Sequence, residues 1–236
     1  QTTQYFSSGN NYANYFIPDS LTKVQVRGER ILYGAFMNCS NIQEIEILDS
    51  VTEIGSSAFN GMNGVKKATF PYLFTSTVPW SNLREVHVTG GTLVNRAFAG
   101  KSSLQKAIID EGVVVAEDAN YLFYQCSSLK EASLPSNWTR LGGYTFYQCS
   151  NLETVNLPEG LITIEYDAFY GCKKLKNVTL PDTLEEIGAY FMYQCTSLES
   201  IKIPAKITAI PNYAFTECSA LTSVDLTEAT QIASIG

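Results

Sequence analysis

The chain has 236 residues, enough for one large domain or two small ones. Apolar residues make up 45% of it and the mean hydropathy is near zero, as in a folded protein rather than a disordered one. The 16 Lys and Arg residues against 23 Asp and Glu residues give a net charge of −7, which argues against nucleic acid or an anionic membrane as partner, and no apolar run approaches the ~20 residues that span a bilayer.

A repeated unit organises the chain from about residue 17 onward. In the first half, apolar residues at positions i, i+3 and i+5 mark five short strands, spaced by 21, 23, 18 and 21 residues. These strands are Leu21/Val24/Val26, Ile42/Ile45/Ile47, Val65/Ala68/Phe70, Leu83/Val86/Val88 and Leu104/Ala107/Ile109. Residues 24–36 also match residues 86–98 at an offset of 62, which suggests that a block of about three repeats was itself duplicated.

The second half repeats more strictly. Five cysteines lie 23 residues apart there, and a strand of the same i, i+3, i+5 pattern begins three residues after each. The cysteines are Cys126, Cys149, Cys172, Cys195 and Cys218, and the strands begin at Leu129, Leu152, Leu175, Leu198 and Leu221. A Phe precedes the Cys by three residues in four of the five units, so we expect Phe146 and Phe169 to lie in the core.

Stacking explains this repeat. A unit of 23 residues cannot bury three apolar clusters alone, but it can do so against its neighbours. Each coil returns to the same place, so the strands should be parallel and spaced ~4.8 Å apart. We predict that residues 1–236 form a single solenoid of about ten coils, a segment of a longer array, and that the stretch before Ile17 is the tail of a preceding coil.

The units resemble the BspA-like, or Treponema-type, class of leucine-rich repeats. Its pattern is L-x-x-[IV]-x-L-P-x-x-[LIV]-x-x-I-G-x-x-A-F-x-x-C-x-x, which residues 175–197 (LKNVTLPDTLEEIGAYFMYQCTS) follow nearly throughout. The resemblance covers about residues 17–236 and implies a parallel β-sheet on the concave face, with short turns, 3-10 or single-turn helices on the convex side. Departures at Met62, Trp80, Lys101 and Asp118 predict that the middle coils are the least regular.

The six cysteines are predicted to be buried free thiols. A disulfide ladder fails, because Cys39 has Met62 at the next coil and the remaining five are odd in number. Methionine can replace a buried sulfur but cannot form a disulfide, and metal binding needs converging ligands rather than a line of them. A catalytic cysteine needs a base, and His87, the only histidine, lies in a strand away from the Cys column.

No sequence motif of an enzyme is present. We find no G-x-S-x-G, H-E-x-x-H, P-loop or G-x-G-x-x-G motif, and the carboxylates are scattered over solvent positions of the repeat. We therefore expect a chain without catalytic residues, metal or cofactor. His87, at an exposed strand position between Thr69 and Ile108 of adjacent coils, is interpreted as a surface residue.

The exposed strand positions change character along the array. Opposite charges alternate on adjacent coils through Lys23, Glu44, Lys67, Glu85, Lys106 and Glu131. They predict cross-strand pairs that hold the sheet in register. Small polar residues follow at Thr154, Asn177, Ser200 and Ser223, so this change is a candidate partner site. The candidate binding residues are Lys130, Glu131, Glu153, Asn156, Lys176 and Thr179.

Tyrosine also recurs in register. One column is Tyr124, Tyr147, Tyr170 and Tyr193, and a second, partial column is Tyr121, Tyr144, Tyr190 and Tyr213. Such rings can stack between coils and fix the corners, which is the favoured interpretation. They can also contact proteins or sugars, so the first column is an alternative binding flank.

The resemblance implies a function in recognition. Proteins of this class are bacterial and protist surface proteins whose best-attested activity is adhesion to host matrix proteins or other cells. The leading hypothesis is a non-catalytic extracellular or cell-surface module that binds a host matrix protein, another surface protein or a glycan. The alternatives are a structural spacer that displays another domain and, less favoured, an accessory module of an enzyme.

Overall fold

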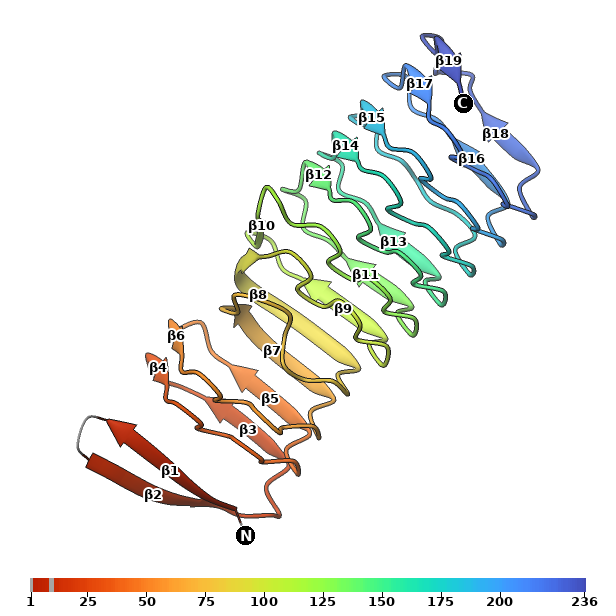
Figure 1. The fold of residues 1–236 in the computed structure, drawn as a ribbon. Helices are drawn as coiled ribbons and strands as arrows, with labels where there is room; N and C mark the ends of the chain where they lie inside the picture. The colour runs from red at the N-terminus through yellow and green to blue at the C-terminus, as the bar shows by residue number, and fades with distance from the viewer. Residues whose placement is uncertain (1, 9–10) are drawn as a thin grey trace.

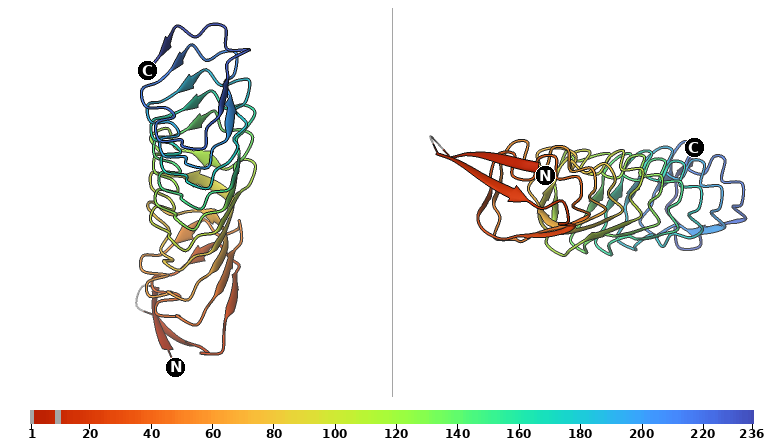
Figure 2. Two further views of the ribbon diagram at one scale, coloured as in Figure 1. Left: turned by 90° about the vertical axis from the view of Figure 1, so that its right-hand side faces the viewer. Right: turned by 90° about the horizontal axis from the view of Figure 1, so that it is seen from below.

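The computed structural model describes residues 2–8 and 11–236, with side chains from Ile17 onward. The chain winds into an elongated stack of coils, and the two termini lie at opposite ends of it (Figures 1 and 2). The described residues form β-strands joined by turns, bends and irregular backbone, and no helix is present among them. The predicted repeat solenoid is therefore confirmed.

The longer strands line one side of the stack, called the sheet face below (Figure 1). In spatial order it consists of β3 (Lys23–Val26), β5 (Glu44–Ile47), β7 (Lys67–Tyr72), β8 (Glu85–Leu93), β9 (Lys106–Ile109), β11 (Glu131–Ser133) and β13 (Thr154–Asn156), followed by the pair β16 (Ser200–Lys202) and β18 (Ser223–Asp225). The opposite flank carries two-residue strands: β4 (Arg30–Ile31), β6 (Glu53–Ile54), β10 (Val114–Val115), β12 (Arg140–Leu141), β14 (Thr163–Ile164), β15 (Glu186–Ile187), β17 (Ala209–Ile210) and β19 (Ser234–Ile235).

The strands of the coils are parallel, and their register is the one that the repeat predicts. The central apolar positions pair from coil to coil through Val24, Ile45, Ala68, Val86, Ala107, Ala132 and Val155. One expected strand is missing. Leu175, Val178 and Leu180 are buried as predicted, but residues 175–180 form no strand with β13 or β16.

The N-terminal segment differs from the expectation. β1 (Thr2–Ser8) and β2 (Asn11–Ile17) form an antiparallel hairpin in which Thr2 pairs with Ile17, rather than the tail of a parallel coil. A signal for a hairpin is present in the sequence as Gly9-Asn10, a residue pair typical of tight hairpin turns.

Successive turns, rather than 3-10 or single-turn helices, close most coils. Eight corners have two residues at positive φ, four apart: Gly34/Asn38, Ser57/Gly61, Arg96/Gly100, Tyr121/Gln125, Tyr144/Gln148, Asp167/Gly171, Tyr190/Gln194 and Tyr213/Glu217. The corner between β7 and β8 lacks this pair. A left-handed residue interrupts helical geometry, so N–H groups here also bond to the neighbouring coil. Phe146 N, for example, donates to Ala168 O at 2.8 Å, and Gln148 N donates to Tyr170 O at 2.7 Å.

The core is a set of columns that run along the stack. Phe98, Phe123, Phe146 and Phe169 are fully buried and stack face to face at centroid distances of 5.3 to 5.4 Å. This confirms that Phe146 and Phe169 are core residues. The residues that replace Cys in its column, Met62, Trp80 and Lys101, are buried as well, so the irregular middle coils keep the same interior column.

Candidate functional site

The cysteine column is structural. All six cysteines are free and buried, as predicted. The structure adds a hydrogen bond that the sequence did not suggest: Cys149 Sγ donates to Phe123 O of the preceding coil at 3.1 Å, and Cys126, Cys172, Cys195 and Cys218 repeat this contact at 3.1 to 3.2 Å. Burial raises the pKa of Cys126 to about 12 and raises the pKa values of Cys149 and Cys172. These thiols are poor nucleophiles.

His87 has a partner that the sequence analysis missed. It lies between Thr69 and Ile108 on the sheet face, as expected, and its Nε2 is 2.7 Å from Asp110 Oδ1. Asp110 lies two residues beyond Ile108, which occupies the position of His87 on the next coil, so the repeat period by itself does not point to it. In the part of the chain that the structure describes, no three His, Cys, Asp or Glu side chains converge as a metal site would require.

Three lysines in strands of the sheet face pair with a Glu on the next strand. Lys23 Nζ lies 2.9 Å from Glu44 Oε1, and Lys67 Nζ lies 3.6 Å from Glu85 Oε2. Lys106 forms an ion pair with Glu131. The predicted ladder of opposite charges is therefore confirmed, and each pair joins adjacent parallel strands.

The second half of the sheet face has two open depressions, which contain four of the six candidate binding residues. Lys130, Glu131 and Glu153 line one of about 320 Å3, together with Glu85, Gln105, Lys106 and Thr154. Glu153 and Lys176 line another of about 520 Å3, together with Thr154, Lys174, Asn177 and Ser197. Asn156 and Thr179 are exposed, but they line neither depression. The sequence analysis did not identify Lys174 or Ser197.

The larger depression adjoins the break in the sheet. β13 pairs with β11 on one side, but residues 175–180 form no strand beside it. On its other side, the backbone of this segment is bonded to the following coil by one hydrogen bond, from Glu199 N to Lys176 O at 3.1 Å. The corner of the same coil stays bonded to its neighbour, with Phe169 N donating to Phe191 O at 3.0 Å. At this coil the strand hydrogen bonds are therefore lost on the sheet face, while the corner keeps its backbone hydrogen bonds.

The charged candidate residues there are largely unpaired. Among the described side chains, Lys130, Glu153 and Lys176 have no ion-pair partner, whereas Glu131 is paired with Lys106. All six candidate residues are exposed. Apart from Glu131, these side chains can exchange water for a ligand without first breaking an ion pair within the protein.

The tyrosine flank is a stack of half-buried rings. Tyr124, Tyr147, Tyr170 and Tyr193 follow one another at centroid distances of 5.1, 4.6 and 4.8 Å, nearly parallel. Their faces therefore contact one another, and this column cannot also offer those faces to a sugar. The Tyr193 hydroxyl donates to Glu217 Oε1 at 2.6 Å, and this bond, with some burial, raises the pKa of Tyr193 to about 12.

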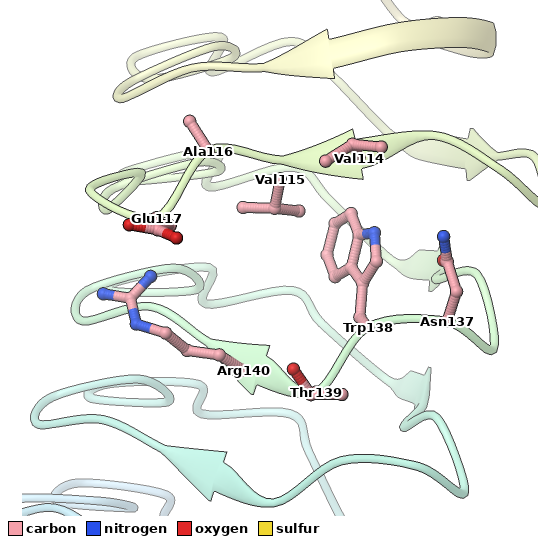
Figure 3. Close-up of a pocket in the computed structure, with 8 residues that line it drawn as sticks. All are labelled: Val114, Val115, Ala116, Glu117, Asn137, Trp138, Thr139 and Arg140. Atoms are coloured by element: carbon pink, nitrogen blue, oxygen red, sulfur yellow. The ribbon is translucent and has the colours of Figure 1, made fainter.

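A third depression, of about 310 Å3, lies on the opposite flank between β10 and β12 (Figure 3). Val114–Glu117 and Asn137–Arg140 line it. Two of its polar side chains have partners within the protein: Trp138 Nε1 donates to Val113 O at 3.1 Å, and Arg140 Nε donates to Glu165 Oε1 at 2.7 Å. The sequence analysis did not identify this depression.

Comparison with known proteins supports the fold. The sequence profile described as BspA type leucine rich repeat region matches residues 2–114, 81–166 and 139–236. A leucine-rich repeat protein of T. pallidum is 22% identical over 72% of this chain and 78% of that one, with a TM-score of 0.56. A leucine-rich repeat protein of Bacteroides ovatus is 20% identical over 100% of this chain and 89% of that one, with a TM-score of 0.47. The pneumococcal vaccine antigen PcpA is 24% identical over 88% of this chain and 66% of that one, with a TM-score of 0.45.

Two further comparisons concern sequence and membranes. No curated protein sequence matches this chain significantly. Within residues 2–8 and 11–236 there is no helix with the length and apolar character that crossing a bilayer requires.

Proposed function

The chain belongs to the family of BspA-type leucine-rich repeat proteins, and we propose that it is a non-catalytic recognition module whose sheet face binds a protein or glycan partner. Repeat solenoids expose long, regular surfaces, and the proteins of this family are typically not enzymes. The partner would lie over the second half of the sheet face, around Glu131 and Glu153.

The observation that supports this placement is the change in ion pairing along the sheet face. The strand lysines Lys23 and Lys67 of the first half are ion-paired, whereas Lys130, Glu153 and Lys176 have no such partner in the described residues and line open depressions. A stacked sheet is already ordered before binding, so its side chains lose less entropy when a partner docks.

The proposal includes a position outside the cell or at its surface. The resemblance to surface repeat proteins implies that position. Buried thiols with raised pKa values also suit an oxidising environment, because thiols of this kind resist oxidation.

The test is a binding screen of this chain against matrix proteins, mucins and glycans, followed by substitution of the face. The six candidates Lys130, Glu131, Glu153, Asn156, Lys176 and Thr179 are replaced together with Ala or Ser. The matched control replaces six sheet-face residues of the first half: Gln25, Gln43, Glu44, Glu46, Lys66 and Thr69. We expect both variants to fold by circular dichroism and only the first to lose binding; loss in the control alone would contradict the proposal.

A structural spacer is the second candidate, favoured by the stacked Phe and Tyr columns that run through several coils. A spacer predicts no partner in the screen, or binding that neither variant changes. Loss of binding on replacing Tyr124, Tyr147, Tyr170 and Tyr193, with both sheet-face variants unchanged, would instead move the site to the tyrosine flank.

A further inference from the structure

Most cations of this protein have a partner within the chain. Seven Lys or Arg side chains form ion pairs or bond to Glu, and others bond to Gln or lie over a tyrosine ring, as Arg96 lies 4.3 Å from the Tyr121 centroid. Lys101 is buried. From residue 17 onward, five exposed cations are left without an ion pair or a side-chain hydrogen bond: Arg84, Lys130, Lys173, Lys174 and Lys176.

These five cations, called the cation row below, lie along one edge of the sheet face. Arg84, Lys130 and Lys176 occupy the same position of the repeat, just before the strand, with Gln105 and Glu153 on the coils between them. Backbone bonds link this position from coil to coil: Gln105 N donates to Arg84 O at 2.7 Å, Lys130 N to Gln105 O at 2.9 Å and Glu153 N to Lys130 O at 2.9 Å. Successive cations of this position are therefore two coils, or about 10 Å, apart.

Lys173 and Lys174 extend the row at its C-terminal end. They precede Lys176 on the same coil, and Lys174 lines the larger depression with it. The unpaired carboxylates at this edge are Glu153 and Glu199, so the row carries five positive against two negative charges in a chain of net charge −7. The neighbouring Lys106 and Glu131 neutralise each other.

We infer that the cation row binds an anionic polysaccharide, a chain bearing sulfate or carboxylate groups, laid along the stack across several coils. This inference rests on the proposed function and names the chemical class of its partner. The charge of the row opposes that of the ligand, and the regular spacing suits a polymer whose charges also repeat. Lysine is a flexible point charge, so it can follow sulfates without the fixed geometry that a guanidinium imposes.

The lining favours a polysaccharide over an acidic peptide. Thr154, Asn177 and Ser197 supply hydroxyl and amide groups that suit sugar hydroxyls, and no apolar side chain lines this depression. Peptides and proteins dock chiefly through buried apolar or aromatic anchors. The exposed large apolar side chains nearest to this depression in sequence, Ile162 and Tyr166, lie on either side of the flank strand β14 rather than on the sheet face.

The experiment measures binding of dextran sulfate, with neutral dextran of the same length as the control ligand. We expect the protein to bind dextran sulfate and not neutral dextran. The affinity for dextran sulfate should fall more than tenfold between 50 and 500 mM salt, roughly the range over which salt comes to screen exposed charges strongly. The variant Lys130→Gln/Lys174→Gln/Lys176→Gln should bind about tenfold or more weakly, the combined effect of three exposed contacts.

The matched control variant is Lys23→Gln/Lys67→Gln/Lys202→Gln, which removes the same charge from ion-paired lysines of the same face. We expect its affinity to change less than about threefold. An equal loss in both variants would show that net charge alone is sensed and would overturn the inference. So would absence of dextran sulfate binding, or binding of polyglutamate as tight as that of dextran sulfate.

One further variant separates this inference from the proposed function. Glu131→Ala/Asn156→Ala/Thr179→Ala removes polar groups of the face and leaves the cation row intact. If a partner from the screen depends on these three residues and not on the lysines, the proposed function stands and the polysaccharide inference fails.

Discussion

Phe146→Ala tests the stacked core most directly. Phe146 is fully buried, and its ring lies 5.4 Å from both Phe123 and Phe169, at interplanar angles of 6° and 16°. Truncation removes the ring from both neighbours and leaves a cavity that the coils above and below cannot close, because their backbones are bonded at the same corner.

The expected cost is large. Replacing a buried Phe with Ala typically costs about 3–5 kcal/mol of unfolding free energy, and two ring contacts place Phe146 in the upper part of that range. Phe36 is the matched control. It is half-buried and stacks on one ring, Phe59, at 6.0 Å, so Phe36→Ala should cost about 1–2 kcal/mol.

The assay is urea unfolding followed by far-ultraviolet circular dichroism, with midpoints compared at equal slope. The reasoning is refuted if Phe146→Ala costs less than about 1 kcal/mol, or no more than Phe36→Ala. Either result would mean that ring stacking in the Phe column contributes less to the free energy of unfolding than its geometry indicates.

Three further predictions concern thiols, turns and tyrosine. Native alkylation should label few of the six cysteines and denatured alkylation all of them; two or more stoichiometric disulfides, seen by mass spectrometry, would contradict the buried-thiol ladder. Gly100→Ala should lower the unfolding free energy by about 1–2 kcal/mol although nothing lies within 4 Å of the added Cβ, because φ is +72° there; an unchanged urea midpoint would exclude this cost. Glu217→Gln should lower the pKa of Tyr193 from about 12 toward 10, measured by ultraviolet titration of the phenol. Because that pKa is raised by folding, the stability that this bond adds is present below pH ~10 and is lost as the pH rises to about 12.

Several site features were within reach of sequence reasoning. The period placed Lys106 opposite Glu131 and located the exposed positions that line the depressions. It did not point to Asp110, the partner of His87, because it places Ile108 beside His87 and Asp110 lies two residues further on. The sequence did not predict Lys174 and Ser197 as lining residues. They lie at the corner before the strand, where the repeat pattern does not indicate which way a side chain points.

The sequence by itself determined the periodic features of this protein. A unit that cannot bury its apolar residues alone must stack, and stacking aligns every equivalent residue with its copy on the next coil. Parallel register, the Phe column, the free thiols and the pairing of Lys23 with Glu44 all follow from that alignment.

Only the tertiary structure decided where the ladder opens and which charges stay unpaired. Opposite charges alternate on adjacent coils at two positions of the repeat: Lys106 and Glu131 form a pair, whereas Lys130 and Glu153 do not. The first two belong to β9 and β11, whose pleat aims both side chains to the same side of paired strands, and the other two lie in irregular backbone just before a strand. The place of a residue in the repeat does not fix whether it pairs, since Lys66 donates to Gln43 at the position that Lys130 and Glu153 occupy; pairing depends on how each side chain lies in its own coil, which the sequence pattern does not give.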